Sequence, residues 1–565
     1  MNAELLLAHF DRISDAPDAV PRLRRFILDL AVRGKLVEQD LRDEPASELL
    51  KRIRTEKTKA IEKGEARKEK PLPLLAQPDL PFPIPNCWCW SQLAEIGFIN
   101  PRNSGEDNAE TSFVPMTLIS AEYGVANTHE VRLWGEIKSG FTHFRDGDVA
   151  LAKITPCFEN GKSTVFRGLT GGIGAGTTEL HVVRPVIVLS EYVLIFLKSS
   201  HFIESGVPRM TGTAGQKRVP TEYFANSPFP VPPLPEQRRI VTRVSDLMAL
   251  CELLEAAQRK RDICHDQFAA ATHHHLNDGL NAEALRIRAH FFVGHLPLLT
   301  TRSRQIKQLR DDILNLAVHG RLSSQEDEIA LSSSPVANSI SIIDSSFPKH
   351  WLIQHLAKVA STIVDCPHST PKWTTDGKIC VRTNQFRVGY LDLSDVRYVS
   401  ESTYLERIQR LEPAEDDVLY SREGGILGVA CRVPANTQLC LGQRMMLIRS
   451  GPQVDPRFLE LVLNSPLITT IAREKTTGGA APRINVATVK AYPIPVPPIA
   501  EQHRIVARVD ELMLLCDQLE TQLHTAQAES SRLLESVLHK ALSGEEAPGN
   551  PSSSPWSVQR KLVSQ

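Results

Sequence analysis

The chain has 565 residues, of which 42% are hydrophobic and 23% charged, and its formal net charge is −1 at pH 7. This length predicts several structural units rather than one core. The longest apolar runs are far short of the roughly 18 residues that cross a bilayer, and no basic segment precedes the short apolar stretch at the N-terminus. With ten scattered cysteines, we expect a cytoplasmic protein with no membrane partner. The near-zero charge by itself gives no support for nucleic-acid binding.

Two segments of the chain each occur twice. Residues 231–251 recur as 496–516 with 14 of 21 positions identical, and residues 23–36 recur as 309–322 with nine of 14 identical. A weaker third copy of the second segment lies at 533–544. The repeats indicate an internal duplication, in which each half is a helix, a linker, a globular block and a second helix.

The duplication predicts an organisation in six parts. They are an N-terminal helical region with its linker (1–80), a first block (81–232), a central helical region (233–345), a second block (346–497), a C-terminal helical region (498–545) and a flexible tail (546–565).

The first linker is strongly basic. Residues 51–70 carry nine basic and four acidic side chains and run into a proline-rich stretch. We favour a solvated helix end followed by an extended connector, because charge runs usually mark solvated faces. The alternative is a basic arm close to DNA phosphates.

An apolar seam runs along each long helical segment. Its members recur at spacings of four and three, which keeps them facing a partner helix as in a coiled coil. They are Ile240, Val244, Leu247, Cys251 and Leu254 in the first half and Ile505, Val509, Leu512, Cys516, Leu519 and Leu523 in the second. Pro235 suits the first turn of such a helix, and Gly34, Gly320 and Gly544 occupy places typical of left-handed helix stops. A helix from Ile505 to Ala541 would span roughly 55 Å.

The two blocks contain short β-rich runs interrupted by Gly, Pro and Asn. Residues 148–154, 163–168, 179–189 and 417–421 are of this kind, and they predict a mixed α/β fold with a twisted sheet that carries loops. The glycines of GGIGAG at 171–176 alternate and do not form a dinucleotide-binding turn. We interpret this segment as a flexible loop.

Three consecutive histidines invite a metal site, but the pattern argues against one. On a helix His273, His274 and His275 point in different directions and cannot share one ion. Two further pairs, Cys87 with Cys89 and Cys366 with His368, lack a second ligand pair. We also find no phosphate-binding glycine loop of the G-x-x-x-x-G-K-[ST] type, so we expect neither a metal nor a cofactor on this chain.

The combination of motifs resembles the specificity subunits of type I restriction–modification systems, over essentially the whole chain to about Gly544. The resemblance rests on the repeated helix starts PPLPEQ and PPIAEQ, the repeated helix ends LAVRGKL and LAVHGRL, and the paired blocks between them. Residues 144–162, 176–185 and 211–220 resemble one type of target-recognition domain in that family. Residues 365–373, 418–428 and 439–447 resemble another common type.

The resemblance implies a subunit that reads double-stranded DNA and has no chemistry of its own. Two target-recognition domains would be separated by long antiparallel coiled-coil helices and related by a pseudo-two-fold axis. They would read the unequal halves of a split, asymmetric target. Two methyltransferase subunits with S-adenosylmethionine would dock on the helices, and two restriction and translocase subunits that use ATP and Mg would join them.

The candidate DNA-binding residues have side chains that suit base edges or phosphates. In the first block they are Lys153, Thr155, Asn160 and Lys162 on one segment and Arg209, Thr213, Gln216, Lys217 and Arg218 on another. In the second block they are His368, Ser369, Thr370, Lys372, Ser421, Arg422, Gln443, Arg444, Lys475 and Arg483. Glu423 could accept from a cytosine amino group, although a salt bridge with Arg422 is the better interpretation. For each loop, a solvated turn is the competing explanation.

Two other functions compete with that of a reader. One is a self-contained methyltransferase or nuclease fused to its own reading domain, and the other is a purely structural coiled-coil adaptor. An enzyme needs a cofactor turn, a phosphate loop or an acidic metal site that we do not find. An adaptor leaves the two large loop-rich blocks without a role.

Overall fold

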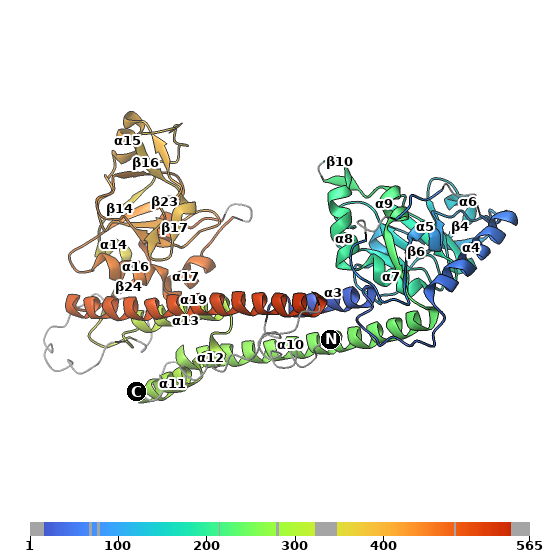
Figure 1. The fold of residues 1–565 in the computed structure, drawn as a ribbon. Coiled ribbons are helices and arrows are strands. Elements are labelled where there is room, and N and C mark those ends of the chain that lie inside the picture. The colour runs from blue at the N-terminus through green and yellow to red at the C-terminus, as the bar shows by residue number, and fades with distance from the viewer. Residues whose placement is uncertain are drawn as a thin grey trace. The chain divides into compact units, whose positions relative to one another are not determined.

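The computed structural model describes residues 16–66, 71–75, 80–213, 215–277, 282–322, 347–478 and 482–543. The chain divides into two compact units. The first unit comprises Met1–Lys260 with Gln527–Gln565, and the second comprises Arg261–Ala526. Each contains one sheet-rich block and parts of both long helices (Figure 1).

The described part of the first unit begins at residue 16 and contains first the helices α3 (Ala19–Val32) and α4 (Ala46–Glu62). Its block contains the strands β1 (Cys89–Gln92), β2 (Gly97–Ile99), β3 (Glu110–Val114), β4 (Glu130–Leu133), β5 (Thr142–Arg145), β6 (Val149–Ala152), β7 (Ser163–Val165), β8 (Ile173–Gly176), β9 (Leu180–Pro185), β10 (Thr211–Thr213), β11 (Gln216–Arg218) and β12 (Pro228–Val231). The helices of the block are α5 (Leu93–Ile96), α6 (Trp134–Ile137), α7 (Ser190–Leu197), α8 (Ser200–Gly206) and α9 (Thr221–Asn226). The long helix α10 (Leu234–Asn277) comes next and continues into the second unit.

The second unit continues with α11 (Ala282–Gly294), α12 (Leu296–Leu299) and α13 (Ser303–Val318). The strands of its block are β13 (Leu352–His355), β14 (Ala360–Asp365), β15 (Trp373–Thr374), β16 (Lys378–Val381), β17 (Phe386–Arg387), β18 (Tyr390–Leu391), β19 (Arg397–Val399), β20 (Val418–Ser421), β21 (Ala430–Arg432), β22 (Leu439–Leu441), β23 (Met445–Ser450) and β24 (Pro493–Val496). Its helices are α14 (Leu356–Val359), α15 (Glu401–Ile408), α16 (Pro456–Asn464), α17 (Pro466–Glu474) and α18 (Val486–Lys490). The helix α19 (Ile499–Ser543) starts here and ends in the first unit.

The two blocks share one framework. The four-stranded antiparallel sheet β2-β9-β6-β7 of the first has its counterpart in β14-β23-β20-β21 of the second. A second sheet differs in its outer strands, with the order β4-β3-β8-β5 in one block and β15-β19-β16-β22 in the other, and each has one parallel pair. Duplicated, sheet-rich units joined to long helices confirm the predicted mixed α/β fold.

An ion pair with a buried carboxylate recurs at one end of the two central strands of each main sheet. Arg184 donates to both carboxylate oxygens of Asp148 at 2.8 Å, and Arg449 contacts Asp417 at 2.8 and 2.7 Å. Both carboxylates are almost fully buried. Two bonds from a planar guanidinium to a carboxylate fix the orientation of both groups, so the pair ties β6 to β9 and β20 to β23.

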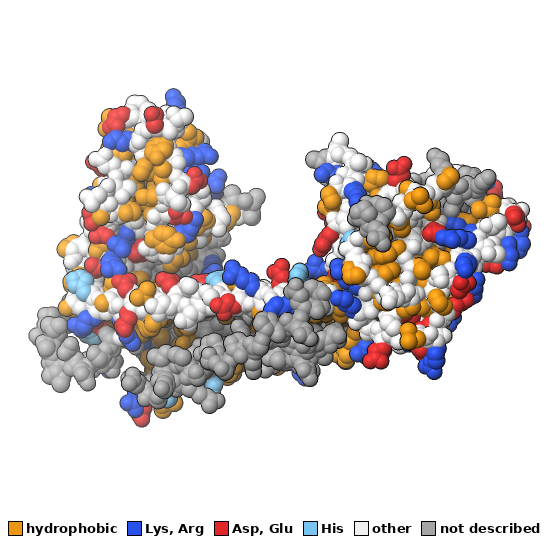
Figure 2. Space-filling view, in the orientation of Figure 1, with side chains coloured by type: hydrophobic (Ala, Val, Ile, Leu, Met, Phe, Trp, Pro, Cys, Tyr) orange, Lys and Arg blue, Asp and Glu red, His pale blue; other side chains and the backbone are white. Residues whose placement is uncertain are grey.

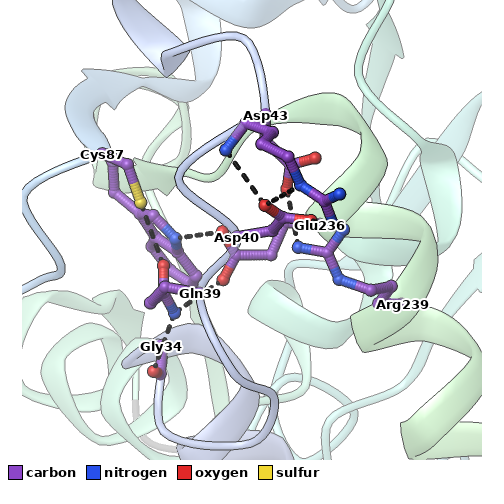
Figure 3. A network of polar contacts seen from close by, with 9 residues as sticks. Gly34, Gln39, Asp40, Asp43, Cys87, Glu236 and Arg239 are labelled. Carbon is purple, nitrogen blue, oxygen red and sulfur yellow. Dashed lines mark hydrogen bonds and ion pairs between the residues drawn. The ribbon is translucent and has the colours of Figure 1, made fainter.

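The start of each long helix is tied to its block by a tryptophan. In the first tie Glu236 of α10 accepts from the Trp88 indole at 2.9 Å. It also accepts from the Gln39 amide at 2.8 Å (Figure 3). Arg239 pairs with Asp43 at 2.6 Å beside it. In the second unit Trp351 donates to Glu501 of α19 at 3.3 Å. The repeated PEQ and AEQ motifs therefore supply buried acceptors at the helix starts.

The apolar seams pack inside the units. Each shares a core with one face of the short repeated helix of its own unit. The residues are Ile240, Val244 and Cys251 with Val20, Ile27 and Ala31 in the first unit, and Ile505, Val509 and Cys516 with Ile306, Ile313 and Ala317 in the second. Gly34 and Gly320 have φ of +68° and +67°, which confirms the predicted helix stops. Gly544 lies outside the described residues.

The structure refines one sequence interpretation and overturns another. Most of the basic linker forms the helix α4, whose Leu49, Leu50 and Ile53 are buried while its charged face is mainly exposed. The segment GGIGAG is not a flexible loop, because its last four residues form β8 in the middle of a sheet. A Cβ on Gly174 or Gly176 would lie 2.4 Å from the carbonyl oxygen of Ser112 or Val114. The alternating glycines therefore serve close strand packing.

Candidate nucleic-acid interface

In the first unit the two candidate segments meet. Ile154 forms an antiparallel bridge with Arg218. The backbone N–H of Thr155 donates to the carbonyl of Lys217 at 3.0 Å, and the Lys217 N–H lies 3.2 Å from the Thr155 hydroxyl. Lys153 accepts from Val219 on the other side, at 2.8 Å. The hairpin β10–β11 is thus joined to the end of β6, and Thr213, Gln216 and Lys217 are exposed on it.

The turn after β6 carries the other candidates. Asn160 is exposed, while Lys162 is half-buried with Nζ 3.4 Å from the carbonyl of Met116. A residue that sequence reasoning missed supports this turn, because the buried Lys198 donates to the carbonyls of Ala121 at 2.8 Å and Gly161 at 3.0 Å. Burial lowers the pKa of Lys198 to about 7. Arg209 lies over the ring of Tyr223, 5.2 Å from its centroid.

Arg218 is held by an acid that sequence reasoning also missed. Its Nε and NH2 lie 2.9 and 2.8 Å from the two carboxylate oxygens of Glu179, just before β9. This hydrogen-bonded guanidinium lowers the pKa of Glu179. The candidate surface of the first unit therefore contains an ionised pair beside the exposed Lys217.

The second unit repeats the backbone arrangement. Glu423 bridges Arg483, and Gly424 donates to the carbonyl of Pro482 at 2.9 Å. Lys475 is exposed after α17, and Arg483 lies beside Glu423. The segments after β20 and before α18 therefore come together as their counterparts do in the first unit.

Two candidates of the second unit lie inside the protein. The Ser421 side chain is fully buried. Arg422 is only 6% exposed and donates to both carboxylate oxygens of Asp365, at 2.9 and 2.8 Å. It also contacts Glu423 at 2.7 Å, which bears out the salt-bridge interpretation of Glu423. Arg422 therefore holds the loop in place through buried contacts and does not face solvent.

The loop between β14 and β15 lies next to the Gln443 turn. The Gln443 amide donates to the carbonyl of His368, and His368 lies 3.3 Å from Asp365. The buried Arg407 of α15 clamps this region, since it donates to the carbonyls of Ser369 at 3.2 Å and Gly442 at 2.9 Å. Thr370 and Lys372 lie on the same loop, with Thr370 exposed. Nothing in the local sequence around Arg407 marks it as a support for the loop.

Arg444 occupies the position that Glu179 holds in the first unit, one residue before the equivalent strand. It is exposed and has a φ of +71°, a conformation that side-chain-bearing residues seldom adopt. Where the first unit pairs Glu179 with Arg218, the second unit has Arg444 and Arg483. The two otherwise matched surfaces therefore differ in charge.

Neither unit has one large surface of a single charge in the view of Figure 2. In the view of Figure 2, Lys and Arg are interspersed with Asp and Glu over both units, consistent with the net charge of −1. Among the residues that the structure describes, no group of three or more His, Cys, Asp and Glu could hold a metal ion. No described helix is long and apolar enough to cross a membrane.

Comparisons with known proteins agree with one another. Residues 387–526 match the family model of the type I restriction modification DNA specificity domain. The chain is 36% identical over 561 residues to the Escherichia coli type I restriction enzyme EcoEI specificity subunit, covering 93% of this chain and 94% of the relative. It is 35% identical over 549 residues to the EcoAI specificity subunit of E. coli, covering 90% and 93% of the two chains.

The fold also occurs among solved structures. A chain from a structure that concerns complex assembly and conformational transition of the type I R-M system superposes with a TM-score of 0.51 at 19% identity, and the match covers 82% of this chain and 99% of that one. At this identity the likeness is one of fold alone.

A duplicated helical frame that carries two blocks with matched scaffolds and different loops defines a two-module recognition protein. The chain belongs to the family of type I restriction–modification specificity subunits, as the full-length relatives show. Such subunits recognise DNA for a restriction–modification enzyme and are not themselves catalytic.

Proposed function

We propose that each unit reads one half of a bipartite, asymmetric DNA target. The observation that carries the proposal is the pair of equivalent bridges, Ile154 to Arg218 and Glu423 to Arg483. Each joins the same two strand ends, and the side chains beside them differ between the units. A common scaffold with different reading groups suits two unequal half-sites.

The candidate residues divide by the chemistry of their side chains. We assign Asn160, Gln216, His368 and Gln443 to base edges, because amides and imidazoles offer donors and acceptors there. We assign phosphate contacts to the basic and hydroxyl groups, which fix register and not sequence. These are Lys153, Thr155, Lys162, Arg209, Thr213, Lys217, Arg218, Ser369, Thr370, Lys372, Arg444, Lys475 and Arg483. The buried Arg422 acts by positioning the neighbouring loop, and the buried Ser421 is given no DNA contact.

The long helices have the second role in the proposal. They set the distance between the two reading surfaces, and their exposed faces dock two methyltransferase subunits. Leu250, Leu253 and Ile263 of α10 are exposed apolar residues that suit such docking. S-adenosylmethionine, ATP and Mg belong to the partner subunits, including two restriction and translocase subunits, in a cytoplasmic complex.

A block exchange tests the reading role. Residues 81–232 are replaced by the equivalent block of a relative with a different target, and the variant is co-expressed with the methyltransferase partner. We expect mapping of methylated bases to show one new half-site and one unchanged half-site. The reciprocal exchange of residues 346–497 is the matched control. A change in both halves from one exchange would show that the blocks do not read independently.

A second experiment, on the purified wild-type chain and its assembled complex, separates the rival functions. The purified chain, incubated with labelled S-adenosylmethionine and DNA, should bind DNA without transferring label. Transfer by the isolated chain would favour a self-contained methyltransferase. Failure of the assembled complex to prefer any sequence would favour a structural adaptor.

A further inference from the structure

Each unit contains a junction between a short repeated helix and the C-terminal part of a long helix. In the first junction α3 packs against the end of α19, and Lys35 donates to the carbonyl of Leu542. In the second junction α13 packs against the end of α10, and Arg321 donates to the carbonyl of Asn277 at 3.2 Å. Lys35 aligns with Arg321 in one repeat, and the offset of the other repeat, carried along α10 and α19, aligns Asn277 with Leu542. The two junctions are therefore equivalent.

The centre of the first junction is apolar. Phe26 of α3 lies in one cluster with Leu534, Val537 and Leu538 of α19, and all four are at least nine-tenths buried. Nothing in this layer restricts the partner beyond shape, because apolar contacts are not directional.

The centre of the second junction is polar at the same positions. Asp312 replaces Phe26 and His273 replaces Leu538, and the two side chains are in contact while only 1% and 4% exposed. Asp312 also accepts from the amides of Asn277 at 2.7 Å and Gln308 at 3.1 Å. The layer is therefore a hydrogen-bonded network that crosses from α10 to α13.

This network is not what the best stability would require. The Nε2 atom of His273 is buried without a hydrogen-bond partner, which is unfavourable in a low-dielectric interior. The first junction shows that the central layer of the equivalent helix pair can be made of apolar residues alone. Buried polar pairs of this kind often serve to fix which helices associate.

A duplicated chain has a particular need for such a restriction. If α3 occupied the end of α10, Phe26 would face His273 and separate it from its carboxylate partner. If α13 occupied the end of α19, Asp312 would be buried against Leu538 and Leu542, and it would keep only the Gln308 amide of its own helix. Burying a carboxylate that has lost its imidazole partner and one of its two amide donors is unfavourable, so both crossed pairings are penalised.

We propose that the buried His273–Asp312 pair is a pairing code, which admits α13 and excludes α3 from the C-terminal part of α10. The excluded partner is the α3 helix of the same chain or of a second copy of this chain. The code makes the two equivalent junctions non-interchangeable, so that one chain assembles each junction in one way.

The test uses the full chain after unfolding in denaturant and refolding at micromolar concentration. His273→Leu with Asp312→Phe gives the second junction the residues of the first. We expect this double variant to remain folded and to show a several-fold larger fraction of dimers and higher oligomers than the wild type by light scattering. Exchanging the code completely, by adding Phe26→Asp and Leu538→His, should return the distribution to that of the wild type.

The exchanged variant separates a pairing code from a simple contribution to stability. If the network only contributed to stability, the four-substitution variant would form at least as many dimers and higher oligomers as the double variant. This result would overturn the proposal. Because Phe is much larger than Asp, His273→Leu with Asp312→Leu serves as a second apolar pair. A wild-type oligomer distribution in both apolar pairs, or loss of the fold in both, would also overturn it.

Discussion

The indole Nε1 of Trp88 lies 2.9 Å from Oε2 of Glu236 at the first turn of α10, and this glutamate has no exposed surface. Glu236→Ala would leave the buried indole N–H without its acceptor, and the Gln39 amide with only the carbonyl of Gly34 at 3.4 Å. We expect a local destabilisation of about 2–3 kcal/mol, measured by hydrogen exchange of the first turns of α10. Glu236→Gln keeps an acceptor and should cost less.

The second unit provides the matched control for this prediction. Trp351 contacts Glu501 at the longer distance of 3.3 Å, and the partly exposed His350 shares the same carboxylate oxygen. Glu501→Ala should therefore loosen the start of α19 less than Glu236→Ala loosens α10. An equal loss of protection from hydrogen exchange in the two variants would contradict the prediction that Glu236 contributes more to its helix start than Glu501.

A second prediction concerns the charge difference between the reading surfaces. Arg444 is exposed where the first unit has Glu179, which holds Arg218 at 2.8 Å. Arg444→Ala should remove one phosphate contact and lower the slope of log affinity against log salt by about one. Glu179→Gln should release Arg218 and raise that slope. The measurement is DNA binding of the assembled complex at several salt concentrations.

The control for the charge prediction is an exposed arginine outside the candidate segments. Arg42 is exposed and paired with Asp40 at 2.8 Å, so Arg42→Ala should leave the salt slope unchanged. If Arg444→Ala behaves like Arg42→Ala, Arg444 makes no phosphate contact.

A third prediction separates phosphate contacts from base contacts. Lys217→Ala should weaken binding about equally on every sequence, because a phosphate carries no sequence information. Asn160→Ala or Gln443→Ala should instead relax discrimination at one base pair by ~1–3 kcal/mol. Competition binding on a panel of single-base variants decides between the two outcomes. A uniform loss in all three variants would refute the assignment to base edges.

The duplication made much of the fold predictable. The repeats of residues 23–36 and 231–251 located the helices, and the PEQ motif marked the start of α10. The glycine stops at Gly34 and Gly320 were also predictable, because a left-handed residue after a helix strongly favours glycine. Helical periodicity and helix stops depend on residues that are close together in the sequence. The sequence alone was therefore enough to predict these helices and their ends.

The site was predictable only as a set of loops. Contacts such as Ile154 with Arg218 join residues distant in sequence, and no local pattern encodes them. Burial could not be predicted from the sequence either. Arginine is a residue type that suits a DNA contact, but Arg422 is buried and paired with Asp365 of β14. The error at residues 171–176 has the same origin. Glycines that serve close strand packing look like loop glycines until the neighbouring strand is known.

A fourth prediction tests the helices as spacers. Insertion of one residue after Glu255 would rotate the remainder of α10 by about 100° and shift the seam, so DNA binding of the complex should largely fail. Insertion of about seven residues would nearly restore the phase and add roughly 10 Å, about three base-pair steps. Methylation mapping should then show a longer spacer between unchanged half-sites. An unchanged spacer in an active variant would mean that other subunits set the distance.

The last prediction concerns stability and pH. Burial raises the pKa of Glu460 in α16 from 4.5 to about 7, against the opposing effect of Arg432. Between these values the folded chain binds a proton that the unfolded chain has lost. The contribution of the Glu460 carboxyl to the free energy of unfolding is therefore fully present below pH 4.5 and falls as the pH rises to about 7.

Glu460→Gln removes the titration while keeping the shape of the side chain. Below pH 4.5 the variant should match the wild type, because the wild-type carboxyl is then neutral in both states. Above pH 7 the variant should be the more stable protein, by an amount on the order of 2 kcal/mol. Thermal unfolding of the full chain across this pH range checks the prediction, with the exposed Glu474→Gln as the control. A difference between wild type and Glu460→Gln that does not change with pH would show that Glu460 is not the titrating group.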